Sequence, residues 1–266
     1  MNKLYSLIVV IIPFLCCLHL FAQNEHVYKF IENKGQWPSS VQFKTDINGG
    51  ALFLQKNGFT YNFQDYSELL AFHIPANAPK NKDINNIHLK SHAFRVNFLN
   101  SNPNVKVSSE NPSSEFYNFF LGNDSSLWAS GAKAYKNISY NELYKGINLE
   151  LYTEDYHLKY DIIVSSYGNY NDINLQYESV SDIFLRNGNL FIRTSVNEIQ
   201  EQKPFAYQII NGKKKEVTCE FILKNNTVSF LIDSKYDKSK ELIIDPVLIF
   251  ASYSGSTANN FGMTAT

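Results

Sequence analysis

The chain has 266 residues, with 24 Lys and Arg against 25 Asp and Glu, for a formal net charge of −1. This balance argues against a nucleic-acid or polyanion partner, which would require a clustered basic surface. The length allows a core that holds the fold without disulfides, because the buried fraction of the surface rises with chain length.

The N-terminus has the pattern of a secretory signal peptide. Lys3 supplies the positive start, residues 7–15 form an apolar run interrupted by Pro13, and Ala22 offers a small residue at a cleavage point. The run is shorter than the about 20 apolar residues of a membrane span. We therefore expect residues 1–22 to be a signal peptide and the mature chain to have no transmembrane segment. The protein is then secreted or lies on the outer cell surface.

The three cysteines refine this expectation. Cys16 and Cys17 lie within the leader and raise a lipoprotein alternative, but Phe14 and Leu15 before them are bulky where lipoprotein processing prefers small residues. Only Cys219 remains after the leader, so the mature chain has no internal disulfide. Cys219 falls on the apolar side of its segment, which predicts a buried, unreactive thiol.

Most of the chain after the leader shows the apolar–polar alternation of half-buried strands. In chain order, the alternating apolar positions are Phe94, Val96 and Phe98; Ile147, Leu149 and Leu151; Leu158, Tyr160, Ile162 and Val164; Val217, Cys219, Phe221 and Leu223; and Val228, Phe230 and Ile232. We expect Phe94, Val96, Phe98, Leu158, Tyr160, Ile162 and Phe221 to point into the core.

Asn and Gly pairs separate these runs and predict tight turns, because both residues tolerate positive φ. The pairs lie at residues 48–50, 57–58, 187–189, 211–212 and 225–226. Helical periodicity is nearly missing, and only residues 66–72 and 115–121 are predicted to form short helices.

The spacing of strands and turns predicts an antiparallel all-β fold that is sandwich-like, with strands polar on one side. We expect two packed β subdomains, residues 23–125 and 126–247.

The C-terminal stretch is predicted to leave this fold. Pro246 has no N–H for a sheet ladder, so a strand should end or change direction there. Residues 248–266 read as the truncated beginning of a propeller-type repeat, because an apolar strand leads into a Gly/Ser turn. We expect residues 247–253 to pair with an edge of the preceding domain and residues 254–266 to be extended.

Five segments together resemble a known family. They are FIENKGQW at 30–37, YKGINLELY at 144–152, LKYDIIV at 158–164, PFAYQ at 204–208 and LIIDP at 242–246. Their order and spacing resemble the uncharacterised N-terminal domain of large secreted Bacteroidetes proteins. ASYSGS at 251–256 and NNFG at 259–262 resemble the start of an SBBP repeat, although Gly-Gly-Ser is common where Ser254-Gly255-Ser256 stands here.

The resemblance implies the architecture of the longer protein. Such proteins typically continue into SBBP-type β-propeller repeats, and many end in adhesin-like domains and a gliding-motility-associated, type IX secretion sorting tail. The downstream propeller domains would then be partners of this domain within one chain. The family has no established catalytic residues, so none are carried over.

Two histidines are the best metal candidates by spacing. On a helix, His88 and His92 could share a zinc ion. His92, however, leads into the strand of Phe94, where the pair would lie about 13 Å apart. We expect no metal and no cofactor here.

Carboxylates offer a second chemistry. Glu150 and Asp161 lie on the polar sides of two predicted strands. At the right separation, their two carboxyl groups would serve as the acid/base pair of a glycoside hydrolase. Lys159 shares the side of Asp161, so a cross-strand ion pair is the structural alternative. Asp245 is expected to cap the turn at Pro246. Residues 169–174 are oxygen-rich enough for calcium but lack the glycine and distal glutamate of an EF-hand, so a polar hairpin tip is expected.

Trp37 and Trp128 are the candidates for stacking against a glycan, and packing in the core or between subdomains is the alternative. The sequence therefore predicts a non-catalytic structural or interaction domain with an adhesion role and an unidentified extracellular ligand, a glycan or a surface protein. A carbohydrate-binding accessory domain is the alternative, and a glycoside hydrolase ranks last.

Overall fold

The computed structural model describes residues 28–70, 88–154 and 157–251. These residues form an antiparallel all-β fold in which every strand pair is antiparallel, as predicted. Within these ranges, no helix has the length and apolar character needed to cross a membrane. Residues 1–22, predicted to be a signal peptide, and residues 252–266 of the predicted propeller-type repeat (248–266) lie outside the described residues.

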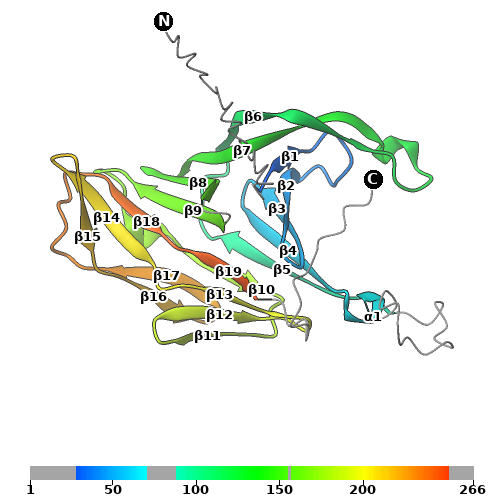
Figure 1. Cartoon of the computed structure of the whole chain (residues 1–266). Coiled ribbons are helices and arrows are strands. Elements are labelled where there is room, and N and C mark those ends of the chain that lie inside the picture. The colour runs from blue at the N-terminus through cyan, green and yellow to red at the C-terminus, as the bar shows by residue number, and fades with distance from the viewer. Residues whose placement is uncertain (1–27, 71–87, 155–156, 252–266) are drawn as a thin grey trace, which may run out of the picture.

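Fifteen strands form a large sheet and four form a small one (Figure 1). The large sheet contains β1 (Phe30–Glu32), β2 (Val41–Ile47), β3 (Gly50–Gln55), β4 (Gly58–Asp65), β5 (Lys90–Phe98), β6 (Lys106–Phe119), β7 (Ala129–Tyr144), β8 (Ile147–Glu154), β9 (His157–Val164), β10 (Leu175–Glu178), β14 (Phe205–Ile210), β15 (Lys213–Val217), β16 (Cys219–Lys224), β17 (Thr227–Ile232) and β18 (Leu242–Asp245). The small sheet contains β11 (Asp182–Arg186), β12 (Asn189–Arg193), β13 (Glu198–Glu201) and β19 (Leu248–Ala251). One short helix, α1 (Ser67–Leu70), and two 3-10 turns, η2 (Ser125–Leu127) and η3 (Tyr170–Asp172), complete the described elements.

The order of the large sheet is β15-β14-β18-β9-β8-β7-β1-β2-β3-β4-β5-β10-β17-β16, with β6 added to β7. Its two end strands, β15 and β16, are separated in sequence only by Thr218, so the chain itself joins the two ends of the sheet. The strands β1 to β5 of the first predicted subdomain form one block in this order, and strands of the second flank it on both sides, since β1 pairs with β7 and β5 pairs with β10. The division near residue 125 stays a prediction.

The inward-facing side chains confirm the predicted strand register. Phe94, Val96, Phe98, Leu158, Tyr160, Ile162 and Phe221 are all buried in one core. Arg95, Asn97, Lys159 and Asp161 lie between them on the less buried side of their strands. The predicted turns are confirmed as well, with positive φ at Asn187, Gly188, Asn211, Gly212, Asn225 and Asn226.

One of the two predicted helices is wrong. Residues 115–119 belong to β6, where Tyr117 lies opposite Ala132 and Phe119 opposite Ala129 of β7. Hydrogen bonding to β7 overrides a weak local helical pattern. The other prediction is confirmed in part, because α1 (Ser67–Leu70) falls inside residues 66–72.

The strand change at Pro246 is confirmed. β18 ends at Asp245 and β19 begins at Leu248, where it pairs with β13 of the small sheet. The described part of residues 247–253 therefore takes a sheet edge of the preceding domain, as expected.

Candidate functional site

The loop after β1 is held by one side chain. The Asn33 amide donates to the carbonyl oxygens of Trp37 (3.1 Å), Pro38 (3.0 Å) and Val41 (2.9 Å). Its Oδ1 accepts from the backbone N–H groups of Gly35 (3.0 Å) and Trp37 (3.3 Å). Five hydrogen bonds from one asparagine give this loop a fixed shape, as a preorganised binding surface requires.

Trp37 sits at the side of this loop. Its ring packs edge-on against Phe53 of β3 (6.3 Å between centroids) and Phe119 of β6 (5.2 Å). The Lys44 Nζ lies 5.9 Å from the ring centroid. These contacts tie the long β6–β7 hairpin to the body of the sheet, and the stacking of a glycan on Trp37 stays a prediction.

A groove of about 700 Å³ opens between this loop and the end of the hairpin. Its lining contains no charged residue and consists of Asn33, Gly35, Gln36, Trp37, Pro38, Ser39, Val41, Gln42 and Leu127. Leu127 belongs to η2, so the groove exists only because the hairpin folds back over the loop. Ligand sites are typically concave and combine apolar side chains with a few polar groups.

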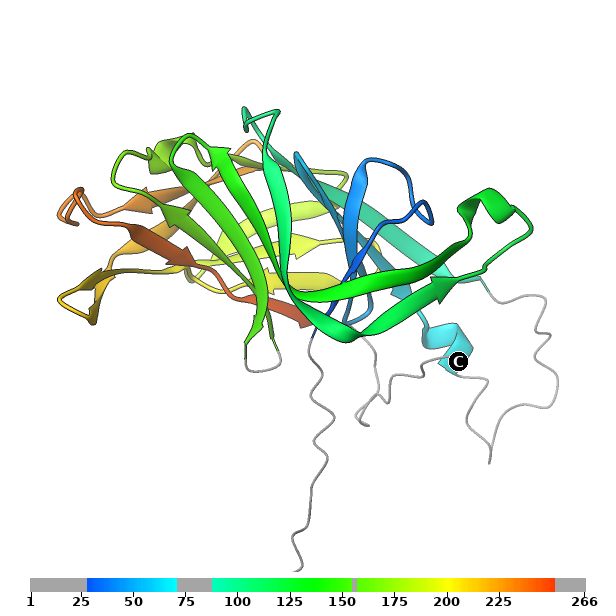
Figure 2. The same cartoon turned by 90° about the horizontal axis from the view of Figure 1, so that it is seen from above.

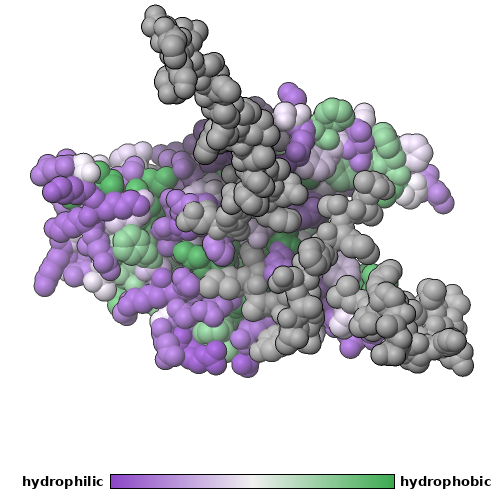
Figure 3. Space-filling model, in the orientation of Figure 1, coloured by the Kyte–Doolittle hydropathy of each residue, from purple (hydrophilic) through white to green (hydrophobic). Residues whose placement is uncertain are grey.

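The end of the β6–β7 hairpin, residues 116–128, carries large apolar side chains that are exposed to solvent. We call this segment the arm. Their exposed fractions are 67% for Phe116, 59% for Phe120, 79% for Leu121, 51% for Leu127 and 45% for Trp128. The Trp128 ring packs edge-on against Phe120, and its Nε1 donates to the Gly122 carbonyl at 3.3 Å. Figures 1 and 2 show the arm reaching beyond the sheet, and Figure 3 shows apolar residues grouped along it.

The structure therefore places both predicted tryptophans around one surface, with Trp37 in the groove and Trp128 next to its lining residue Leu127. Sequence reasoning missed the other exposed side chains of the arm, Phe116, Phe120 and Leu121. The adjacent Phe119-Phe120-Leu121 was the available signal, but it was assigned to a helix. Contiguous exposed apolar side chains typically mark interaction sites.

The predicted carboxylates form a row across three neighbouring strands. Glu150 of β8 lies directly opposite Asp161 of β9. Asp161 in turn lies opposite Asp245 of β18, because the register pairs Ile162 with Ile244 on one side and Lys159 with Val247 on the other. Like charges directly opposite each other destabilise a sheet.

Lys159 forms cross-strand ion pairs, as the structural alternative predicted, but Asp161 is not part of them. The Lys159 Nζ contacts Glu154 at 2.6 Å and Asp245 at 3.4 Å, and no contact to Asp161 accompanies them in the described residues. Asp245 was expected to cap the turn at Pro246, but its carboxylate accepts from Lys159 instead. The lysine of a neighbouring strand is a stronger partner than a backbone N–H.

Burial and then the negative charge of Asp245 raise the pKa of Asp161 to about 6. The Tyr152 hydroxyl donates to the Asp161 carboxyl and Lys159 lies nearby, and both oppose this rise. Burial also raises the pKa of Glu150, with smaller contributions from Glu110 and Glu241. Two carboxyl groups of this row, those of Asp161 and Glu150, therefore have raised pKa values, which is a common mark of functional positions.

The remaining candidates take structural positions. The His92 ring nitrogens lie 2.9 Å from Ser195 Oγ and 2.7 Å from the Ser179 carbonyl oxygen. In the described ranges, no three His, Cys, Asp or Glu side chains lie close enough to hold a metal ion. The Asn169 amide donates to Asp172 Oδ1 at 3.0 Å within η3. Burial raises the pKa of the Cys219 thiol to about 12.

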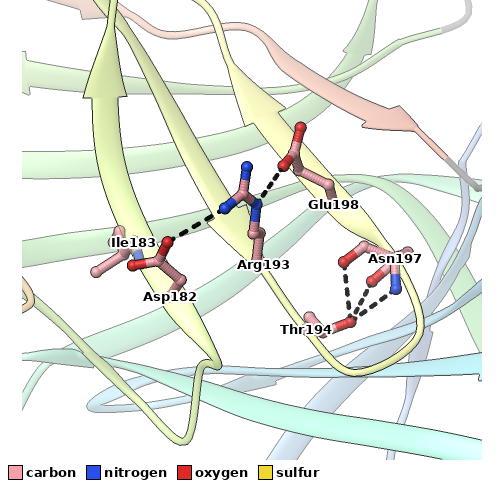
Figure 4. Close-up of polar contacts among 6 residues, drawn as sticks. All are labelled: Asp182, Ile183, Arg193, Thr194, Asn197 and Glu198. Atoms are coloured by element: carbon pink, nitrogen blue, oxygen red, sulfur yellow. Dashed lines mark hydrogen bonds and ion pairs between the residues drawn. The ribbon is translucent and has the colours of Figure 1, made fainter.

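The small sheet carries an ion-pair row on its outer face. Arg193 Nε donates to Glu198 at 2.8 Å, and its Nη1 lies 3.4 Å from Asp182 (Figure 4). The same guanidinium lies over the Phe184 ring, 4.6 Å from its centroid. These contacts link all three of the strands β11, β12 and β13, so we assign the row to sheet cohesion.

These features define an antiparallel all-β domain with a neutral groove beside an exposed apolar arm. The chain belongs to the family described as Domain of unknown function (DUF7948), whose pattern matches residues 30–247. No curated protein and no solved structure shows significant similarity to the chain.

Proposed function

We propose that this chain is a non-catalytic interaction domain of an exported, multidomain surface protein with a role in adhesion. The observation that carries the proposal is the arm, whose five large apolar side chains stand in solvent beside a preformed groove. The resemblance to secreted Bacteroidetes proteins supports the export, the sandwich-like packing and a propeller further along the same chain. This proposal gives the carboxylate row no catalytic role, because Asp161 and Asp245 each have a carboxylate oxygen that is shielded from solvent.

The arm supports protein binding for a physical reason. Burying a large aliphatic or aromatic side chain contributes about 1.5–3 kcal/mol. Phe120, Leu121 and Trp128 therefore offer a concentrated source of binding free energy, and aromatic anchors of this kind dominate protein interfaces.

The groove supports the alternative, a carbohydrate-binding accessory domain. A lining without charges suits a neutral ligand rich in hydroxyl groups, and Trp37 and Leu127 supply apolar surface. The Gln42 and Ser39 side chains make no hydrogen bond within the described ranges, which leaves them available to a ligand.

The test compares variants of the leaderless protein in binding to whole cells and to a glycan array. Replacing Leu121 and Leu127 by Ser should abolish cell binding if the arm is the contact surface. Leu231→Ser is the matched control, because Leu231 on β17 is 55% exposed and lies away from the arm. Equal binding by the arm variant and the wild type would contradict the proposal.

The glycan alternative predicts a different pattern. Gln42→Ala and Trp128→Ala should lower the array signal at least tenfold, while the Leu231→Ser control should not. Gln42 is preferred to Trp37 for this test, because Trp37 also holds the arm against Phe53 and Phe119. If the glycan array gives no signal while cell binding depends on the arm, the partner is a protein.

A further inference from the structure

We propose that Asp161 and Asp245 share one proton and form a pH-sensitive latch at the point where the chain leaves the large sheet. This inference is independent of the proposed function. It concerns the strands β8, β9 and β18, none of which contributes a residue to the arm.

The first support is the placement of the two carboxyl groups. The register on either side puts Asp161 and Asp245 directly opposite each other on adjacent antiparallel strands. Side chains at such positions have Cβ atoms about 4.5–5.5 Å apart. Each group also has one oxygen, Oδ1, that is shielded from solvent and has no hydrogen-bond partner.

The second support is the balance of donors and acceptors. Two ionised carboxylates would leave two shielded acceptors on paired residues without a donor, which is a costly arrangement. One proton removes the difficulty, because a protonated Asp161 donates its O–H to Asp245. The network then runs from the Tyr152 hydroxyl to Asp161, from Asp161 to Asp245, and from Lys159 to both Asp245 and Glu154.

The surrounding charges assign the proton to Asp161 rather than to Asp245. Asp245 forms an ion pair with Lys159, whose Nζ lies 3.4 Å from its carboxylate. Asp161 faces two acids, Glu150 on β8 and Asp245 on β18, and both favour its neutral form. The residue opposite Asp245 on its other side is the uncharged Phe205 of β14.

The position of the pair gives the latch its consequence. Asp245 is the last residue of β18, and Pro246 and Val247 carry the chain across to β19 of the small sheet. The Val247 carbonyl accepts from the Gln202 N–H at 2.9 Å, and Val247 bridges to Lys159. Loss of the shared proton would leave two negatively charged carboxylates opposite each other on β9 and β18. Their repulsion would weaken the strand pair from which Pro246 and Val247 leave the large sheet.

The direction of the pH effect follows from linkage. Asp161 binds its proton more tightly when folded, since its pKa rises from 3.8 to about 6. The folded state therefore loses stability as pH rises from about 4 through 6, and the latch is closed on the acidic side of this window.

A carboxyl titration of the wild-type protein by carbon-13 NMR is the first measurement. The Asp161 resonance should titrate with a midpoint near 6, whereas an ordinary aspartate titrates near pH 3.9. A midpoint at the ordinary value would overturn the shared proton, and this result does not depend on any variant folding.

Asp161→Asn is the matched variant, because the amide keeps an oxygen to accept from Tyr152 and an N–H to donate to Asp245. It should be more stable than the wild type above pH 6, and its melting temperature should change less between pH 4 and 7. Asp182→Asn, on the small sheet, should keep the wild-type slope. An Asp161→Asn variant with the wild-type slope would contradict the proposal.

Hydrogen exchange at the Gln202 amide, which donates to the Val247 carbonyl, tests whether the segment after β18 opens when the proton is lost. Relative to the amides of β3, its exchange should accelerate several-fold as pH rises through 6 in the wild type and not in Asp161→Asn. If the carboxyl titrates near 6 while this ratio stays constant, the proton is shared but does not act as a latch.

Discussion

A single buried acid, Glu201, joins the two sheets. It lies on β13 of the small sheet, is 4% exposed, and its carboxylate accepts from the hydroxyls of Tyr160 on β9 and Tyr177 on β10, each at 3.0 Å. It also lines an internal cavity of about 20 Å³, room for one water molecule. Polar contacts between layers of this kind fix how the layers align, beyond what apolar packing specifies.

Glu201 makes stability fall as pH rises. Burial raises its pKa from 4.5 to about 6, so the folded state holds the proton more tightly than the unfolded chain does. This loss amounts to about 2 kcal/mol and develops between about pH 4.5 and 6. Glu201→Gln should remove it, as measured by urea unfolding at pH 4.5 and 7. Glu198→Gln, on the same strand but paired with Arg193 at the surface, should leave the pH dependence as it is.

The thiol of Cys219 should be inert in the folded protein. It is 2% exposed and burial raises its pKa to about 12, so it lacks the thiolate that reacts with alkylating agents. Iodoacetamide should modify the leaderless protein only in urea. Cys219→Ser should still fold, with a loss of about 1–3 kcal/mol for a buried hydroxyl. Rapid modification without denaturant would show that the site opens.

The alternation of apolar and polar residues was sufficient to predict which side chains are buried at most core positions. Phe94, Val96 and Phe98 were predicted inward because their neighbours are polar, and they are buried. Glu201 was not predicted, because the same rule assigns a glutamate to the outside. Only the hydroxyls of Tyr160 and Tyr177, brought close by the folded sheets, make its inward position favourable.

The arm shows how tertiary contacts determine whether a segment forms a strand or a helix. Residues 115–121 carry no strong alternation, and the strand there forms because β7 offers backbone partners and Trp37 packs against Phe119. The groove could not be predicted for the same reason, since Leu127 reaches the Asn33 loop only after the arm folds back. The two tryptophans were identifiable from residue type alone, because an aromatic ring can stack against a glycan.

Phe119→Ala should loosen the arm. Phe119 packs with Tyr117 and Trp37 against Ala132 and Ala134, so truncation should lower the free energy of unfolding by up to about 3 kcal/mol. Hydrogen exchange of the Tyr117 and Ala132 amides should accelerate as well. Phe116→Ala is the control on the same strand, because Phe116 is 67% exposed and its loss should be nearly neutral. Equal effects of the two variants would mean that the arm is not held through Phe119.

For the whole molecule, the antiparallel all-β class was predictable and the strand order was not. Alternation and turn residues identify strands, but they do not determine that β5 pairs with β10 or that Thr218 joins the two ends of the large sheet. Those pairings depend on contacts between distant parts of the chain.

Removing residues 247–266 should destabilise the domain, because it takes away β19 and exposes the edge of β13. Leu248 is 3% exposed, so its removal would leave a gap beneath the small sheet. We expect a lower melting temperature and stronger light scattering on heating. Removal of residues 252–266 alone is the control and should leave both unchanged. If the longer truncation behaves like the shorter one, β19 contributes nothing to the fold.

The place of β18 in the sheet determines when folding can finish. β18 is the last strand of the large sheet in sequence, yet it lies in its interior, between β9 and β14. A chain that emerges from its N-terminus, during synthesis or export, therefore cannot join these two strands until residues 242–245 have appeared. Together with the distant pairing of β1 and β7, this topology predicts slow folding, on the millisecond-to-second scale of proteins dominated by non-local strand pairs. The domain is completed at its C-terminal end, after nearly all of its sequence is available.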